Sequence, residues 1–136
     1  MSFFKKLISN DNGFNKNAES IDLGLYELSQ EYEVRIERVT ESNSKINRQT
    51  LLPKCKPNDD VTLKQNQNDD GLVEIEVWTK YGMVGFLQYS QVQKVTRSEK
   101  NGGKFTAKIH MITGGTKDKP NYGCILWMQH YVKKED

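Results

Sequence analysis

The strongest constraint on what this chain can fold into is the run Val73–Thr79, in which apolar and polar side chains alternate from Val73 to Val77. Successive side chains of an extended strand point to opposite faces, so residues two apart share a face. Val73, Ile75 and Val77 therefore fall on one face, and the glutamates between them fall on the other. The run predicts a half-buried β-strand whose apolar face lies on a core.

Other short segments carry a similar pattern, and residues typical of turns separate them. The further strands predicted in this way cover residues 32–39, 61–64, 105–111 and 123–131. Lys80-Tyr81-Gly82 predicts a tight turn that joins Val73–Thr79 to Met83–Leu87 as a hairpin.

One helix is predicted among the strands. Ser90 and Gln93 have the spacing of a capping box, in which each side chain satisfies a backbone N–H of the first turn. We expect a short helix that continues to about Arg97 and packs Val92 and Val95 on the core.

Many short strands, an inserted helix and glycine turns are typical of a small β-barrel. We therefore expect a mainly β fold, an OB-like or SH3-like barrel with one or two short helices. The apolar residues that we expect to share its core are Val61, Leu63, Val73, Ile75, Val77, Leu87, Ile109 and Leu126.

The chain of 136 residues has the length of a single domain. We expect residues 31–136 to form the β-domain and residues 1–30 to form an N-terminal arm or helical segment. Within that segment, the spacing of Ile21, Leu25 and Leu28 favours a helix, although Ile21, Leu23 and Leu25 would also suit a strand.

The charge and the cysteine content indicate the cellular compartment of the protein more than its function. The formal net charge of +2 is too small to indicate a nucleic-acid partner by itself. Cys55 and Cys124 are far apart and form no Cys-x-x-Cys, which suggests a reducing compartment and neither a disulfide framework nor a zinc site.

No segment has the ~18 apolar residues of a membrane span, and the apolar run near the N-terminus is too short for a signal peptide. We expect a cytoplasmic protein that does not contact membranes.

The usual signatures of catalytic sites are missing from the sequence. It has no glycine-rich phosphate loop ending in Gly-Lys-Ser/Thr, no His-Glu-x-x-His and no Gly-x-Ser-x-Gly. His110 and His130 have no carboxylate or cysteine nearby in the spacing of a metal site. A cysteine beside a histidine could act as a nucleophile, but a lone cysteine near a strand more often packs in a core. We expect a binding domain rather than an enzyme, with no metal and no cofactor.

From Arg48 onward the order of features is more specific. Arg48 is followed by Leu51-Leu52, by a turn that ends in Asp59-Asp60 and by a Val-x-Leu strand. A polar loop over 65–71 then leads into Val73–Val77, a Val-Gly-aromatic-Leu strand follows at 84–87, and closing segments lie at 108–115 and 122–125. This order resembles the HIRAN family over about residues 32–130.

The resemblance implies an OB-like barrel that captures the 3′ end of single-stranded DNA. Arg48 matches the family's arginine and would hold a phosphate bidentately, or it forms a surface ion pair. Asn68 matches the family's asparagine. The position of the family's aspartate is occupied by Gly71, so Asp70 is the nearest carboxylate that could accept the terminal hydroxyl group.

The resemblance also implies roles for aromatic side chains, because such barrels stack unpaired bases on aromatic rings. Phe86 stands where the family has Tyr or His, and it either stacks a base or is buried in the core. Tyr89 replaces a residue that is basic in DNA-binding members, and it either stacks or packs on the start of the helix. Tyr122 matches the aromatic residue of the closing loop, where it contacts the ligand or anchors the loop. Asp69 takes the place of a further stacking aromatic, so one platform is lost.

Two functional hypotheses follow from the sequence. The first is a nucleic-acid-binding module whose partner is single-stranded DNA or another nucleic acid. The alternative is a protein-interaction module that keeps the barrel without binding DNA, with Trp78, Phe3 and Phe4 contacting a protein partner. A cationic concave surface at the candidate residues would support the first hypothesis, and a flat apolar patch would support the second.

Overall fold

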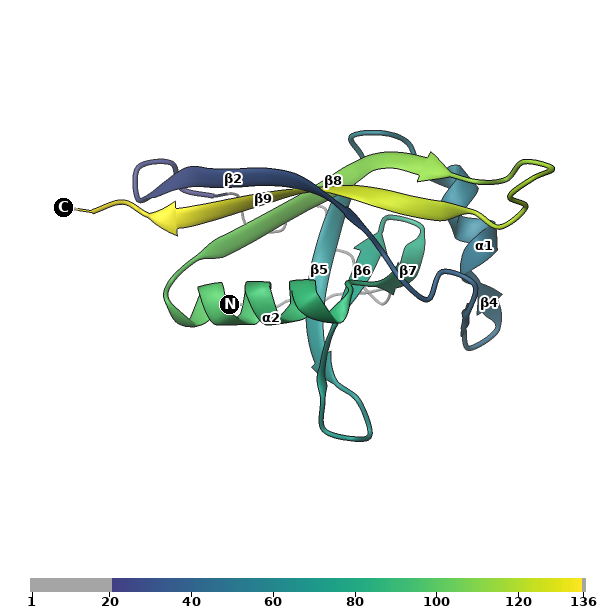
Figure 1. The fold of residues 1–136 in the computed structure, drawn as a ribbon, viewed down its shortest axis with the longest axis horizontal. Helices are drawn as coiled ribbons and strands as arrows, with labels where there is room; N and C mark the ends of the chain where they lie inside the picture. Colours follow the sequence, from purple (N-terminus) through teal and green to yellow (C-terminus); the bar gives the residue numbers. More distant parts are fainter. Residues whose placement is uncertain (1–20, 136) are drawn as a thin grey trace.

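The computed structural model describes residues 21–135, and the expectations for residues 1–20 lie outside that range. Six antiparallel strands form one sheet in the order β2-β9-β8-β5-β6-β7 (Figure 1). These strands are β2 (Tyr26–Arg35), β5 (Asp60–Gln67), β6 (Val73–Thr79), β7 (Gly82–Phe86), β8 (Lys104–Thr113) and β9 (Gly123–Lys133). The mainly β fold predicted from the alternating segments is confirmed.

Shorter elements connect the strands of the sheet. After β2, the chain forms the two-residue strands β3 (Ser42–Asn43) and β4 (Ile46–Asn47), followed by the helix α1 (Arg48–Leu51) and the 3₁₀ turn η1 (Leu52–Lys54). The longer helix α2 (Tyr89–Lys100) lies between β7 and β8, and Figure 1 shows it running along the long β2–β9–β8 ribbon. These two short α-helices also agree with the prediction.

The start of β2 shows which of two patterns decides the structure around residue 25. Although Ile21, Leu25 and Leu28 have helical spacing, the chain enters a strand at Tyr26, and Tyr26 pairs with Lys133 of β9. The sheet thus extends into residues 26–30, which the sequence analysis placed in the N-terminal segment. Pairing with a long neighbouring strand overrides a weak local preference for helix.

The alternation in β6 works as predicted at its centre and fails at its first residue. Ile75, Val77 and Thr79 are buried, whereas Val73 is 37% exposed. Val73 pairs with Gln67 at the outer end of the β5–β6 hairpin, which projects beyond the rest of the sheet (Figure 1). Val73 therefore has the correct orientation but too little structure above it to bury the side chain.

The remaining predicted core residues lie inside the molecule. Leu87, Ile109 and Leu126 are buried, and Val61 and Leu63 are partly buried against the same core. From α2, Val92 and Val95 complete it. The helix begins two residues earlier than predicted, since its N-cap is Gln88 rather than Ser90, and it continues to Lys100. No side chain caps its N-terminus, so the predicted capping box is not formed.

The two outer strands of the sheet meet at one point. Beyond β2, Glu37 forms an antiparallel bridge with Phe86 of β7, with the Glu37 N–H donating to the Phe86 carbonyl at 2.8 Å and the Phe86 N–H donating to the Glu37 carbonyl at 3.0 Å. Gly85 makes this approach feasible, because a Cβ atom at that position would lie 2.6 Å from the Glu37 carbonyl oxygen. The bridge brings the segment after β2 beside the end of β7.

His130 on β9 connects the sheet with α2. Its Nε2 atom lies 2.6 Å from Ser98 Oγ, and its ring stacks on Phe105 with 4.3 Å between the ring centroids. The buried Nδ1 atom has no hydrogen-bond partner among residues 21–135. Burial, with a contribution from Lys94, lowers the pKa of His130.

Replacement of Ile75 by Ala should destabilise the protein by about 2–5 kcal/mol, because the fully buried side chain leaves a cavity between strands and helix. Urea unfolding of the variant and the wild-type protein measures this difference. Val73→Ala on the same strand is the matched control and should lose less than about 1 kcal/mol. Equal losses for the two variants would contradict the assigned register of β6.

The stability of the protein should depend on pH through His130. Because the pKa of His130 is lowered in the folded state, the unfolded chain binds this proton first, so stability falls as the pH drops below about 6.5 and is fully present above it. His130→Gln removes the titrating group and should make the free energy of unfolding less dependent on pH between about 7 and about 5. A variant that loses as much stability over this range as the wild type would show that His130 does not contribute.

Candidate functional site

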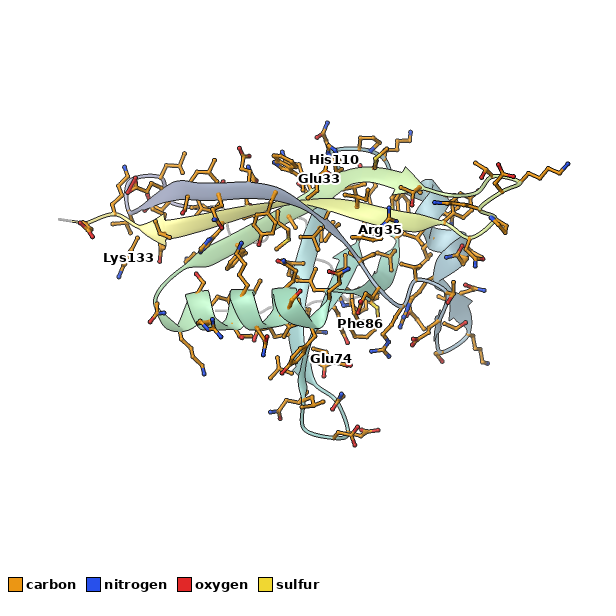
Figure 2. The ribbon with its side chains drawn as sticks, in the orientation of Figure 1. Glu33, Arg35, Glu74, Phe86, His110 and Lys133 are labelled. Atoms are coloured by element: carbon orange, nitrogen blue, oxygen red, sulfur yellow. The ribbon has the colours of Figure 1, made fainter. Side chains whose placement is uncertain are left out.

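Side chains from four separate segments meet beside the Glu37–Phe86 bridge. Arg38 and Glu41 follow β2, Arg48 begins α1, Glu74 lies on β6 and Phe86 ends β7. We call these five residues the arginine–phenylalanine cluster. Figure 2 shows Glu74 and Phe86 on one side of the molecule, and Glu33 and His110 on the opposite side.

Phe86 lies at the centre of this cluster, in contact with both arginines. The side chain is 7% exposed. The Cζ atom of Arg38 lies 4.0 Å from the ring centroid, and that of Arg48 lies 5.1 Å from it. Both distances are within the range of cation–π contacts. The sequence analysis left open whether Phe86 stacks a base or is buried. The ring is buried, and Arg38 covers it on the solvent side.

Arg48 is buried beneath this surface. It is 4% exposed, and its Nε atom donates to Asn43 Oδ1 at 2.7 Å while Nη1 donates to the Arg38 carbonyl at 2.6 Å. Burial lowers the pKa of Arg48, and Glu41, 3.8 Å away, partly offsets this effect. The guanidinium group thus holds the loop that carries Arg38, and its N–H groups are directed to protein acceptors rather than outward.

Arg38 is the exposed arginine of the cluster, and the sequence analysis did not identify it. The chain leaves β2 here, and Arg38 has a φ of +60°, a left-handed conformation that is unusual for a residue other than glycine. Its side chain is 41% exposed and bonds Glu41 through Nε at 2.9 Å and Nη2 at 3.0 Å, and Glu74 through Nη1 at 2.9 Å. The hydrogen bond with Glu41 raises the pKa of Arg38 and lowers that of Glu41.

The polar loop between β5 and β6 reaches the cluster through one residue. Asn68 Oδ1 accepts hydrogen bonds from the backbone N–H groups of Asp70 and Leu72, which fixes the turn, and Asn68 Nδ2 lies 3.5 Å from Glu74 Oε2. Asp70 is exposed at the tip of the hairpin. Gly71 beside it has a φ of +80°. Of Asp70 and Glu74, the carboxylate that bonds Arg38 is that of Glu74.

The two candidate tyrosines have different surroundings. Tyr89 is 63% exposed at the first position of α2, three residues after Phe86. Tyr122 is half-buried against the core, and the side chain of Gln49 in α1 bonds both its N–H at 2.6 Å and its carbonyl at 2.9 Å. Tyr122 thus anchors the loop before β9 to α1, whereas the Tyr89 side chain is exposed to solvent at the start of α2.

The charges of the cluster balance. Two arginines face two glutamates, so the cluster contributes no net charge at neutral pH. The nearby Arg35 of β2 does not belong to this cluster, because its Nη1 atom donates to Thr113 Oγ1 of β8 at 3.2 Å. The surface is neither strongly cationic nor apolar. What distinguishes it is that two guanidinium groups contact one aromatic ring.

Residues 21–135 contain neither a metal-binding cluster nor a reactive thiol. No group of three or more His, Cys, Asp or Glu side chains within residues 21–135 could hold a metal ion. Cys55 and Cys124 are buried and free, and burial raises the pKa of both thiols, that of Cys124 to about 12. Both thiols are therefore protonated at neutral pH, which disfavours nucleophilic chemistry.

Comparisons with known proteins leave the site to be interpreted from its own geometry. No protein-family model, no curated protein and no solved structure matches the chain. None of the helices in residues 21–135 is long and apolar enough to cross a membrane.

Loss of Arg48 should destabilise the fold. Arg48→Ala leaves Asn43 Oδ1 and the Arg38 carbonyl without their donor, at a cost of about 1–3 kcal/mol for each acceptor that stays buried. Arg48→Lys should recover only part of this loss, because an ammonium group lacks the planar fork. Thermal unfolding measures both, with the exposed Arg35→Ala as control. A stable Arg48→Ala protein would mean that the loop does not depend on this residue.

Proposed function

We propose that this chain is a HIRAN-like module whose sheet closes through the Glu37–Phe86 bridge into a small OB-like barrel, and that the arginine–phenylalanine cluster binds single-stranded nucleic acid. The proposal is based on the observation that residues far apart in the sequence meet at this cluster. Arg48, the Asn68 loop and Phe86, which the resemblance singles out at distant positions in the sequence, all contact the cluster or belong to it.

Within the cluster, Arg38 has the geometry to contact the ligand. Its guanidinium plane is backed by Phe86 at 4.0 Å, and its side chain is 41% exposed. Such a plane can stack an unpaired base, and its N–H groups can bind a phosphate bidentately. Arg48 would support this surface from below through the Arg38 carbonyl and the ring of Phe86.

Tyr89 would add a second stacking platform to the surface. The ring of Tyr89 is exposed at the start of α2, directly after the segment that carries Phe86. Stacking on such rings contributes about 1–3 kcal/mol per base and tolerates any sequence.

A protein-interaction module remains the second candidate, and one observation favours it. Leu72 is 56% exposed, and it lies next to the partly exposed Val73 on the projecting β5–β6 hairpin. Two neighbouring apolar side chains at a hairpin end could contact a partner protein, although single exposed apolar residues are common on monomers.

Binding should be measured as the fluorescence anisotropy of a labelled single-stranded oligonucleotide across a series of salt concentrations. We expect binding that weakens as salt rises. Arg38→Ala should weaken binding by about 1.5–3 kcal/mol, the contribution of hydrogen bonds to a charged group, and should reduce the log–log salt slope by at most about 0.7. Tyr89→Ala should weaken binding by about 1–3 kcal/mol at every salt concentration.

Arg97→Ala is the matched control for Arg38, because Arg97 is exposed on α2 eight residues beyond Tyr89. It should change the affinity much less than Arg38→Ala. If neither the wild type nor any variant binds an oligonucleotide at low salt, the nucleic-acid proposal is wrong and the interaction module becomes the better interpretation of the surface.

A further inference from the structure

The exposed arginine of the cluster is already occupied. Glu41 accepts two hydrogen bonds from Arg38, at 2.9 and 3.0 Å, and Glu74 accepts a third at 2.9 Å. These hydrogen bonds use the edges of the guanidinium group, and its Cζ atom lies 4.0 Å from the centroid of the Phe86 ring. A carboxylate that bonds an arginine through two oxygens uses the same geometry as a phosphate group does.

We propose that Glu41 and Glu74 compete with nucleic-acid phosphate for Arg38, so that the binding surface is held in a self-paired, closed state until a ligand displaces a carboxylate. This inference rests on the proposed function and adds a regulatory contact to it. The two glutamates are then an autoinhibitory latch on the arginine.

Both carboxylates are held where they face Arg38. Glu41 stands three residues after Arg38, its N–H donates to the Arg38 carbonyl at 3.4 Å, and its carbonyl accepts from the Arg48 N–H at 3.3 Å. Glu74 is fixed by the β5–β6 ladder opposite Asn66. The latch is thus built from a turn that Arg48 stabilises and from a strand of the sheet.

The same contacts are weak enough to open. The side chains of Arg38, Glu41 and Glu74 are 41%, 47% and 25% exposed, so water and salt screen both ion pairs. Exposed pairs of this kind shift an equilibrium by only about 1.4- to 5-fold each. A nucleic-acid backbone that contacts several groups at once can gain more binding free energy than one of these ion pairs contributes, and it can then displace a carboxylate. An isolated anion cannot.

The test uses Glu41→Gln, Glu74→Gln and the double variant, each of which keeps the shape of the side chain and removes its charge. The probe is a fluorescein-labelled oligothymidine of about 16 nucleotides, long enough to cover one OB-fold site. Each single substitution should tighten binding by about 1.4- to 5-fold, and the double substitution by up to about 25-fold. The salt slope of the double variant should steepen by up to about 0.7, because the freed arginine now neutralises a phosphate.

Two controls separate the latch from a general change in charge. Glu27→Gln makes the same charge change at the far end of β2, opposite Val132, and should leave the affinity close to that of the wild type. Adding Arg38→Ala to the double variant should abolish the gain, since the latch acts through that residue. Circular dichroism and thermal unfolding confirm that each variant is folded.

The outcomes distinguish this inference from the function on which it rests. If the wild type binds and the glutamine variants bind no more tightly, the latch is wrong while the proposed function stands. A gain that Glu27→Gln reproduces, or that survives loss of Arg38, also overturns the latch. Binding by the double variant alone supports the latch in its strongest form, and no binding by any variant overturns both proposals.

Discussion

The backbone bridge between Glu37 and Phe86 is the contact on which the candidate site depends. It joins the segment after β2 to the end of β7, and these are the two edge strands of the six-stranded sheet. Gly85 permits the bridge because any Cβ atom at that position would lie too close to the Glu37 carbonyl. Once the two segments meet, Arg38 must lie over the ring of Phe86, and Glu74 on the neighbouring strand is within reach. A backbone contact thus determines which side chains form the cluster.

Two arginines on one aromatic ring need a physical explanation, because their charges repel and one of them is buried. Arg48 is desolvated, and its burial is compensated by two short hydrogen bonds to neutral acceptors and by the nearby Glu41. Arg38 keeps contact with water and shares its charge with two carboxylates. The cluster therefore separates two roles, with one guanidinium group organising the loop and the other remaining available to exchange partners.

The alternating segments predicted the mainly β fold and the buried centres of β6, β8 and β9, because period-two patterns report directly which side chains face a core. Sequence reasoning failed where the outcome depends on distant segments. The continuous strand expected over 32–39 hides the change of partner at Glu37 and the left-handed Arg38 that follows it. Similarly, the family resemblance pointed to Asp70 as the carboxylate of the site, whereas the carboxylate of β6 that bonds Arg38 is that of Glu74. Which of two arginines is buried is set by tertiary packing, and no local pattern around Arg48 signals it.

A self-paired arginine also changes what salt dependence would mean for this protein. When a phosphate group binds a free cation, it releases its own condensed counterion, and affinity falls as salt rises. When the phosphate displaces Glu41 or Glu74 from Arg38, the released carboxylate attracts a cation from solution, so the net release of ions is smaller. Under the proposed exchange, the salt slope of the wild type therefore understates the number of arginine–phosphate contacts. A shallow slope together with measurable affinity would fit an exchange of ion pairs, and only removal of the carboxylates would reveal the full electrostatic contribution of Arg38.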